Sequence, residues 1–525
     1  MSRVKVLFAT ISALMALSLG AVLGPSLSVW FKPAGEVWTH VLNHVWEQTL
    51  ANTILLVLGS ATLSALVGVT LAYLTTVIAL PMKKMISTLL VLPLALPPFV
   101  VVLVWSQVIS TTGWLYTTLI GLGIPVDPRW TLIDPKLMAI WVYTWSLYPY
   151  VFLVARSALS KHLGPIIENA RLLGHSLWSI YLRIIVPLSL PAMLGGGLIV
   201  ALEVLSDYGV IAYLGIPTMA VSIVRTWIRL GDFDAALRLA LILLGFTGVL
   251  LAMQGILMRS IKPLTPSKPR ALKPIQVTGR WQWVPLTLVG GSLLISLGVP
   301  LLQLVAWAIQ SWERIRWEAV IQASGTTLVL SVGLSVLITG LAVVLGTSQR
   351  WMPKGIGSWG ARGALLGYAV PGSVIGILTL ALLWPFRLPL ALSTTWTLLS
   401  AALILRYTGL AVQSIRQGFT KLGRSLSEAG AVLGHTPVSV WWRVELPLLS
   451  PALIAGFSMV FLDVVKELPL TLLLRPFNTE TLATRIYQYA ADEQVMLAAV
   501  PALVVIGISF GVIVLMTRTS KPEVR

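Results

Sequence analysis

Cysteine is absent from the 525-residue chain, so the protein can form neither disulfides nor thiolate metal sites. Charged residues are scarce as well: Asp, Glu, Lys and Arg make up 11% of the sequence, against 57% for hydrophobic residues. A soluble globular protein of this length carries a larger share of charged residues. The composition therefore excludes an ordinary soluble protein and predicts a polytopic membrane protein.

Several patterns that carry chemistry are also missing. The dipeptide Gly-Lys does not occur, so the sequence lacks the phosphate-binding loop G-x-x-x-x-G-K-[ST]. No group of His, Asp and Glu has the spacing of a stable metal site, and no residues form a recognisable nucleophile and base. We therefore expect no enzymatic activity, no catalytic residues, and no cofactor or metal bound by this chain.

Apolar runs long enough to cross a bilayer, which takes about 20 residues, recur along the whole chain. They lie near residues 6–28, 50–79, 87–110, 136–157, 188–207, 236–258, 284–308, 326–347, 363–385, 390–412, 448–472 and 495–517. These runs predict an all-α fold of about twelve transmembrane helices. For the first run a cleaved signal peptide is the alternative, but a retained helix keeps the later loop charges on one side.

The net charge of +18 has a simple explanation in this topology. Most Lys and Arg residues fall in the N-terminal tail, in alternate loops and in the C-terminal tail, as the positive-inside rule requires of cytoplasmic segments. The basic charge therefore predicts that both termini are cytoplasmic. It does not indicate binding of nucleic acid.

One polar stretch occurs twice, about half a chain apart. Six identities recur without a gap at the spacing 428 − 168 = 260, namely Glu168/Glu428, Gly174/Gly434, His175/His435, Arg183/Arg443, Pro187/Pro447 and Pro191/Pro451. The duplication predicts two homologous six-helix halves, 1–260 and 284–525, joined by a Pro- and Lys-rich cytoplasmic linker at 261–283. We call the two copies the first repeated loop (about 160–187) and the second repeated loop (about 420–447).

The front of each half also matches, at a different spacing. Thr53 and Pro97 recur as Thr327 and Pro371, with 371 − 97 = 274. The larger spacing indicates an insertion in the first half, in the external loop around 113–134, where extra residues are tolerated.

The repeated loops resemble the signature loop of the permeases of ABC importers, which begins Glu-Ala-Ala, reaches a glycine, and ends at a proline. The matching residues are Glu168, Ala170, Gly174 and Pro187 in the first copy, and Glu428, Ala429, Gly434 and Pro447 in the second. The resemblance implies that each loop couples the permease to one of two copies of an ATPase subunit, which bind ATP and Mg²⁺. It also implies an external binding protein and a place in the bacterial inner membrane, in contact with lipid.

A second stretch, residues 466–493, resembles the C-terminal half of fused permeases of ferric-iron importers. This resemblance implies that ferric iron is the substrate. Permeases for thiamine, phosphonate and polyamines share the architecture, so these substrates remain alternatives. A twelve-helix ion-coupled secondary transporter is a further alternative, but it has no need of a repeated docking loop.

A few ionisable residues lie inside the apolar runs, where a charge is costly unless it is paired or faces water. Among them are Glu203, Asp207, Asp463, Lys466 and Glu467. By this argument they line or gate a pathway across the membrane. The alternative is a structural pair of Lys466 and Glu467 that ties helices together.

Overall fold

The computed structural model describes residues 3–162, 164–260, 274–277, 279–383, 395–423 and 425–519. These residues form helices connected by short loops, and the only β-type pairing among them is a single bridge between Ile78 and Ile275. The prediction of an all-α polytopic membrane protein is confirmed. The predicted linker 261–283 lies largely outside the described residues, and the division into halves stays a proposal.

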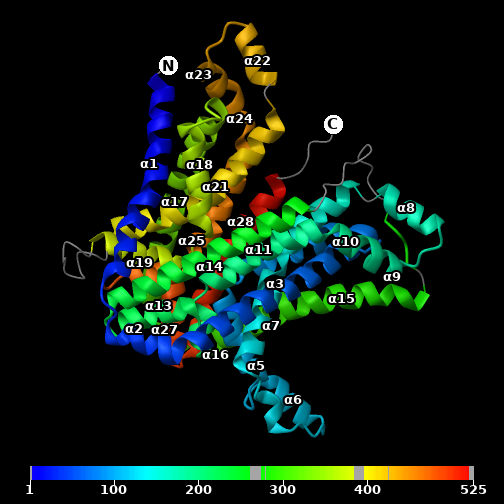
Figure 1. The fold of residues 1–525 in the computed structure, drawn as a ribbon. Helices are drawn as coiled ribbons and strands as arrows, with labels where there is room; N and C mark the ends of the chain where they lie inside the picture. Colours follow the sequence, from blue (N-terminus) through cyan, green and yellow to red (C-terminus); the bar gives the residue numbers. More distant parts are fainter. Residues whose placement is uncertain are drawn as a thin grey trace.

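The helices of residues 3–260 follow one another with few breaks. They are α1 (Arg3–Ser26), α2 (Glu36–His40), α3 (Trp46–Val77), α4 (Lys83–Leu89), α5 (Pro98–Ile109), α6 (Trp114–Gly121), α7 (Pro135–His162), α8 (Gly164–Leu172), α9 (Leu177–Ile180), α10 (Val186–Leu188), α11 (Leu190–Ser206), α12 (Gly209–Tyr213), α13 (Met219–Ile228) and α14 (Phe233–Ser260). The helix α6 lies within the predicted insertion at 113–134, and it projects from the rest of the molecule (Figure 1).

The helices from residue 279 onward repeat much of this order. They are α15 (Trp283–Leu293), α16 (Val299–Ser311), α17 (Trp317–Trp351), α18 (Ile356–Ala369), α19 (Gly372–Leu383), α21 (Trp396–Leu422), α22 (Ser425–Val432), α23 (Pro437–Val440), α24 (Leu446–Leu448), α25 (Ser450–Val465), α26 (Pro469–Leu474), α27 (Leu482–Ala491) and α28 (Ala499–Thr519).

The described residues contain nine helices long and apolar enough to cross a membrane, or twelve if each bent helix pair counts as one span. Three of the predicted runs form bent helix pairs. The predicted run 363–385 turns by 116° between α18 and α19, where Pro371 has no backbone N–H to continue the helix. The runs near 188–207 and 448–472 each bend by 65° where they leave a repeated loop, and the helix of the latter run ends at Val465.

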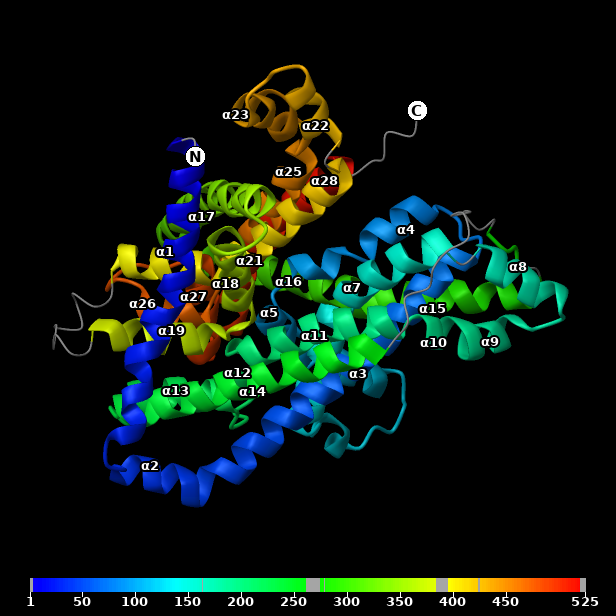
Figure 2. The same ribbon diagram turned by 45° about the horizontal axis from the view of Figure 1, so that its top comes forward.

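The long helices form two arms that meet at one end and diverge at the other, as Figures 1 and 2 show. The first arm contains α3, α7, α11 and α14, and the second contains α17, α18, α21 and α25. The repeated loops, α8–α9 and α22–α23, lie at the diverging ends. At the other end the arms touch through α14 with α19, α13 with α19, and α12 with α27.

Each arm receives its first helix from the other half of the sequence. The helix α1 packs on α17, α18 and α19, and the ring of Phe8 stacks on that of Trp351 at 5.5 Å. Reciprocally, the segment from α15 to α16 contacts α3, α5 and α7 through residues 283–311. The boundary between the halves in sequence is therefore not the boundary between the arms in space.

Candidate functional site

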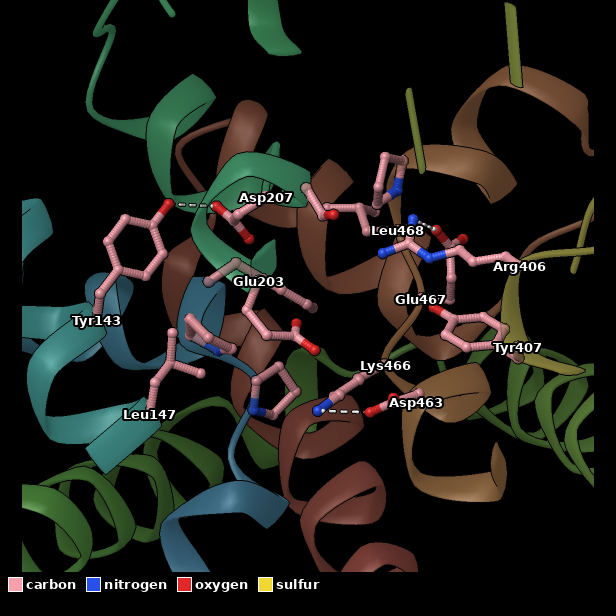
Figure 3. A pocket seen from close by; sticks show the side chains of 15 residues that line it. Tyr143, Leu147, Glu203, Asp207, Arg406, Tyr407, Asp463, Lys466, Glu467 and Leu468 are labelled. Atoms are coloured by element: carbon pink, nitrogen blue, oxygen red, sulfur yellow. Dashed lines mark hydrogen bonds and ion pairs between the residues drawn. The ribbon is translucent and has the colours of Figure 1, made fainter. Parts of the chain in front are cut away.

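Where the arms meet, broken helices enclose a small polar cavity of about 60 Å³ (Figure 3). The chain enters it at the start of α5, between α11 and α12, and between α25 and α26, while α7 and α21 close its sides. Its lining includes all five predicted pathway residues, Glu203, Asp207, Asp463, Lys466 and Glu467, together with Pro97, Pro98, Phe99, Tyr143, Leu147, Ser206, Arg406, Tyr407, Leu468 and Pro469. The fold thus brings together residues more than 250 positions apart.

Two of the acids occupy matching positions at the start of short helices. The carboxylate of Asp207 accepts a hydrogen bond from the backbone N–H of Val210 at 2.9 Å, beside α12. That of Glu467 accepts the N–H groups of Leu470 and Thr471, both at 3.0 Å, in α26. Free N–H groups at a helix start favour a negative charge. The duplication has therefore placed a capping carboxylate on each side of the cavity.

The two capping acids have different second partners. The Tyr143 hydroxyl donates to Asp207 at 2.7 Å, whereas Arg406 forms an ion pair with Glu467 at 3.9 Å. Lys466 pairs with Asp463 at 2.9 Å, and not with Glu467 as the structural alternative supposed. The Arg406 guanidinium packs against Gly372 at the start of α19, where an added Cβ would collide with its Nη1 atom.

Glu203 has a different environment from the other acids. Its only hydrogen bond among the described residues comes from the Tyr368 hydroxyl at 3.3 Å, and no Lys or Arg of the described chain lies within 4.0 Å of its carboxylate. Figure 3 shows this carboxylate pointing into the space between the Asp207 side and the Lys466 side. Among the described residues, it is the one cavity acid that has neither a backbone N–H nor a cation as a direct partner.

The repeated loops have the same backbone in both copies. Each forms a short helix that ends at a glycine with positive φ, Gly174 at +82° and Gly434 at +79°. In the first copy the His175 N–H donates to the carbonyl of Ala170, and the Gly174 N–H to that of Arg171; the second copy repeats both bonds at the equivalent positions. This is the Schellman arrangement, which glycine adopts without a Cβ penalty.

Beyond the glycine, each loop continues in the same order. A short helix leads into a π-helical turn, Tyr181–Ile185 or Trp441–Glu445. The following short helices α10 and α24 hold Pro187 and Pro447 in their first turns. The bend of 65° then directs each chain into its arm.

The tips of both loops expose large apolar side chains just before the glycine. Leu172 and Leu173 are exposed in the first loop, and so are Val432 and Leu433 in the second. Solvent-exposed apolar side chains at matching places on two loops are suited to docking on a protein partner.

The two predicted alanines do not occupy equivalent positions in the copies. Ala170 is buried and corresponds to Gly430, whereas Ala429 is exposed, like Asn169 at its place in the first loop; Glu428 is exposed as well. Glu168 lies in α8, at the position equivalent to Glu428 in α22.

Sequence reasoning missed several residues of these sites. They are Tyr143, Tyr368, Arg406 and Tyr407 at the cavity and Arg350 and Glu445 at the second loop. Arg406 could have been found from the sequence, because a guanidinium inside an apolar run is itself costly. The sequence contains no comparable indication for the tyrosines. In the described part of the chain, no group of three or more His, Asp and Glu could hold a metal ion.

Comparison with known proteins decides the family. Residues 338–520 match the family described as binding-protein-dependent transport system inner membrane component. The molybdenum transport system permease protein ModB of Mycobacterium tuberculosis is 31% identical over 258 residues, which are 43% of this chain and 93% of that protein. The chain belongs to this family of permeases.

Two further relatives carry other substrates in their names. The Fe(3+)-transport system permease protein FbpB 2 of Haemophilus influenzae is 26% identical over 436 residues, 81% of this chain and 80% of that protein. The spermidine/putrescine transport system permease protein PotB of Escherichia coli is 31% identical over 107 residues, 20% of this chain and 38% of that protein. The relatives are permease subunits, and this chain is a multi-pass permease component of an ABC transport system that works with a binding protein. The secondary-transporter alternative is therefore set aside.

Proposed function

We propose that this permease forms the pathway of an importer for ferric iron, delivered by an external binding protein and driven by two copies of an ATPase subunit. The observation that carries the choice of substrate is the charge of the central cavity. Four acidic side chains and two basic ones line it, and both bases are engaged with acids. Glu203 is not paired with either base, so we expect its carboxylate to contact the solute.

An excess of carboxylates favours a cation over an oxyanion such as molybdate. Carboxylate oxygens also suit hard, highly charged cations. The cavity of about 60 Å³ has room for a few water molecules or a small ion, and is short of space for an extended polyamine. The resemblance to FbpB 2 over most of both chains supports the same substrate.

The proposed ATPase contacts are the tips of the two repeated loops. The apolar pairs Leu172–Leu173 and Val432–Leu433 would insert into a groove on each ATPase subunit, with Glu168 and Glu428 beside them. Two matching docking elements suit a partner present in two copies. ATP and Mg²⁺ would be bound by that partner.

The substrate is tested by uptake into cells that express the permease with its cognate ATPase and binding protein. We expect accumulation of radiolabelled ferric iron that depends on ATP and is unaffected by excess molybdate, phosphonate, thiamine or spermidine. Uptake of one of these solutes in place of iron would contradict the proposal and identify the substrate.

The orientation gives a second expectation. If both termini and the linker are cytoplasmic, reporter proteins fused after Arg270 and after Thr517 both give a cytoplasmic signal. An external signal from either fusion would contradict the proposed topology of two six-helix halves.

A further inference from the structure

A buried ionic cluster fixes the second repeated loop to its arm. Arg350, at the end of α17, forms an ion pair with Glu445 at 3.0 Å, and both side chains are nearly inaccessible to solvent. The same guanidinium donates to the Ser427 hydroxyl at 3.0 Å. Ser427 in turn is hydrogen-bonded to Glu445, which closes a three-residue ring.

Arg350 also binds the C-terminal end of the neighbouring helix α21. Its guanidinium donates to the carbonyl of Gly423, directly after α21, and lies over the ring of Phe419 at 5.0 Å. One side chain therefore joins α17, α21, the first short helix of the loop and its π-helical turn. Arginine can do this because its five donors point in fixed directions.

The first repeated loop lacks all three members of this cluster. At the spacing of 260, Ile167 stands in place of Ser427 and Ile185 in place of Glu445; at the spacing of 274, Thr76 replaces Arg350. Both isoleucines are fully buried. The duplicated loops thus share a backbone and an exposed tip but are held by different forces.

We propose that Arg350 is the positioning residue of the second repeated loop, and that an apolar contact of Ile167 and Ile185 has the same task in the first. The second loop moves as one piece with α17 and α21, because breaking the ring leaves a buried charge without its partner. The consequence for transport rests on the proposed function, since it is the ATPase that would move the loop.

A cavity of about 310 Å³ adjoins the cluster and explains why the ring is needed on this side. It separates the loop from α17 and from the start of α1, and Lys5, Trp351 and His435 are among its lining residues. Apolar packing across a space of this size is incomplete, so directional bonds have to hold the loop.

The loop can be observed in the permease alone, because the chain has no cysteine of its own. Leu433→Cys and Leu173→Cys each introduce a single exposed thiol for a spin label, at the tips of the second and first loops. In the Glu445→Gln background we expect label mobility at position 433 to rise at least about two-fold, with position 173 unchanged. Arg350→Gln is expected to do the same.

Two further variants make the test decisive. Lys354→Gln removes an exposed positive charge near Arg350 and is expected to leave the label at 433 unchanged. The combination Arg350→Thr, Ser427→Ile and Glu445→Ile transfers the residues of the first half, leaves no buried charge, and is expected to restrain the label again. An unchanged label in Glu445→Gln, or a mobile one in the triple variant, would overturn the proposal.

In the complete transporter, Glu445→Gln is expected to lower the solute imported per ATP hydrolysed by roughly ten-fold, and the triple variant to recover most of it. Equal ratios for Glu445→Gln and the unaltered protein would overturn the positioning role. A failure of the unaltered protein to import with its ATPase would instead refute the proposed function and leave the label result standing.

Discussion

Gly434→Val is expected to abolish most ATP-driven uptake while the protein inserts normally into the membrane. At φ = +79° the backbone of Gly434 lies in the left-handed region, and no atom stands within 4 Å of an added Cβ. The damage therefore comes from backbone strain and not from a clash. Strain of about 1–3 kcal/mol corresponds to a 5- to 150-fold loss of the docking-competent turn. The measurement is ATPase co-purification together with uptake in vesicles.

Gly174→Val is expected to impair transport as well, because φ is +82° there and the proposed function requires both repeated loops to dock. Gly507→Val is the matched control: this glycine of α28 also has open space around it, but its φ is not positive. We expect near-normal uptake from the control. If both loop variants keep the ATPase and transport at the rate of the unaltered protein, the repeated loops are not coupling elements.

Hydropathy predicted twelve spans, and the described residues contain nine candidate spans, or twelve if each bent pair counts as one. Hydropathy identifies segments such as α3 and α17, because a bilayer demands long apolar helices whatever their neighbours. The glycine turns were predictable for a similar reason. A positive φ is a local property of the backbone. Glycine adopts it easily, so a glycine repeated at 174 and 434 indicates a turn with positive φ at both positions.

The neighbours of each helix could not be predicted in this way. Nothing in the hydropathy of α1 says that it packs on α17 and α18, since any apolar helix satisfies the lipid equally well. The breaks between helices within a run could not be predicted from hydropathy either. The run 448–472 is apolar enough on average to be counted as one span, but its helix ends at Val465, and Glu467 caps the next helix, α26.

The roles of the individual charges also depended on tertiary contacts. The five predicted pathway residues were found from their cost in an apolar run, and all five line one cavity. Their partners Tyr143, Arg406 and Tyr368 come from other helices, so spacing along the chain could not pair them. The contacts now divide the acids into anchored ones, such as Glu467, and one that faces the cavity, Glu203.

The contrast between the anchored acids and Glu203 leads to the second prediction with a large expected effect. Glu203→Gln is expected to lower uptake by at least about ten-fold, or 1.4 kcal/mol, with membrane abundance and ATPase co-purification unchanged. Glutamine has nearly the same volume and keeps an acceptor oxygen for the Tyr368 hydroxyl, so only the charge facing the cavity is removed. Uptake and abundance are measured on the same membranes.

Glu467→Gln is the informative comparison, because the same chemical change falls on an anchored acid. Glu467 uses one oxygen for the N–H of Leu470 and the other for Thr471, so an amide group would face an N–H donor. The change also leaves Arg406 buried without its ion pair, which costs on the order of 3–5 kcal/mol. We therefore expect Glu467→Gln to lose abundance and uptake together. Normal uptake by Glu203→Gln, or a loss of abundance equal to that of Glu467→Gln, would show that Glu203 is not the acid that meets the solute.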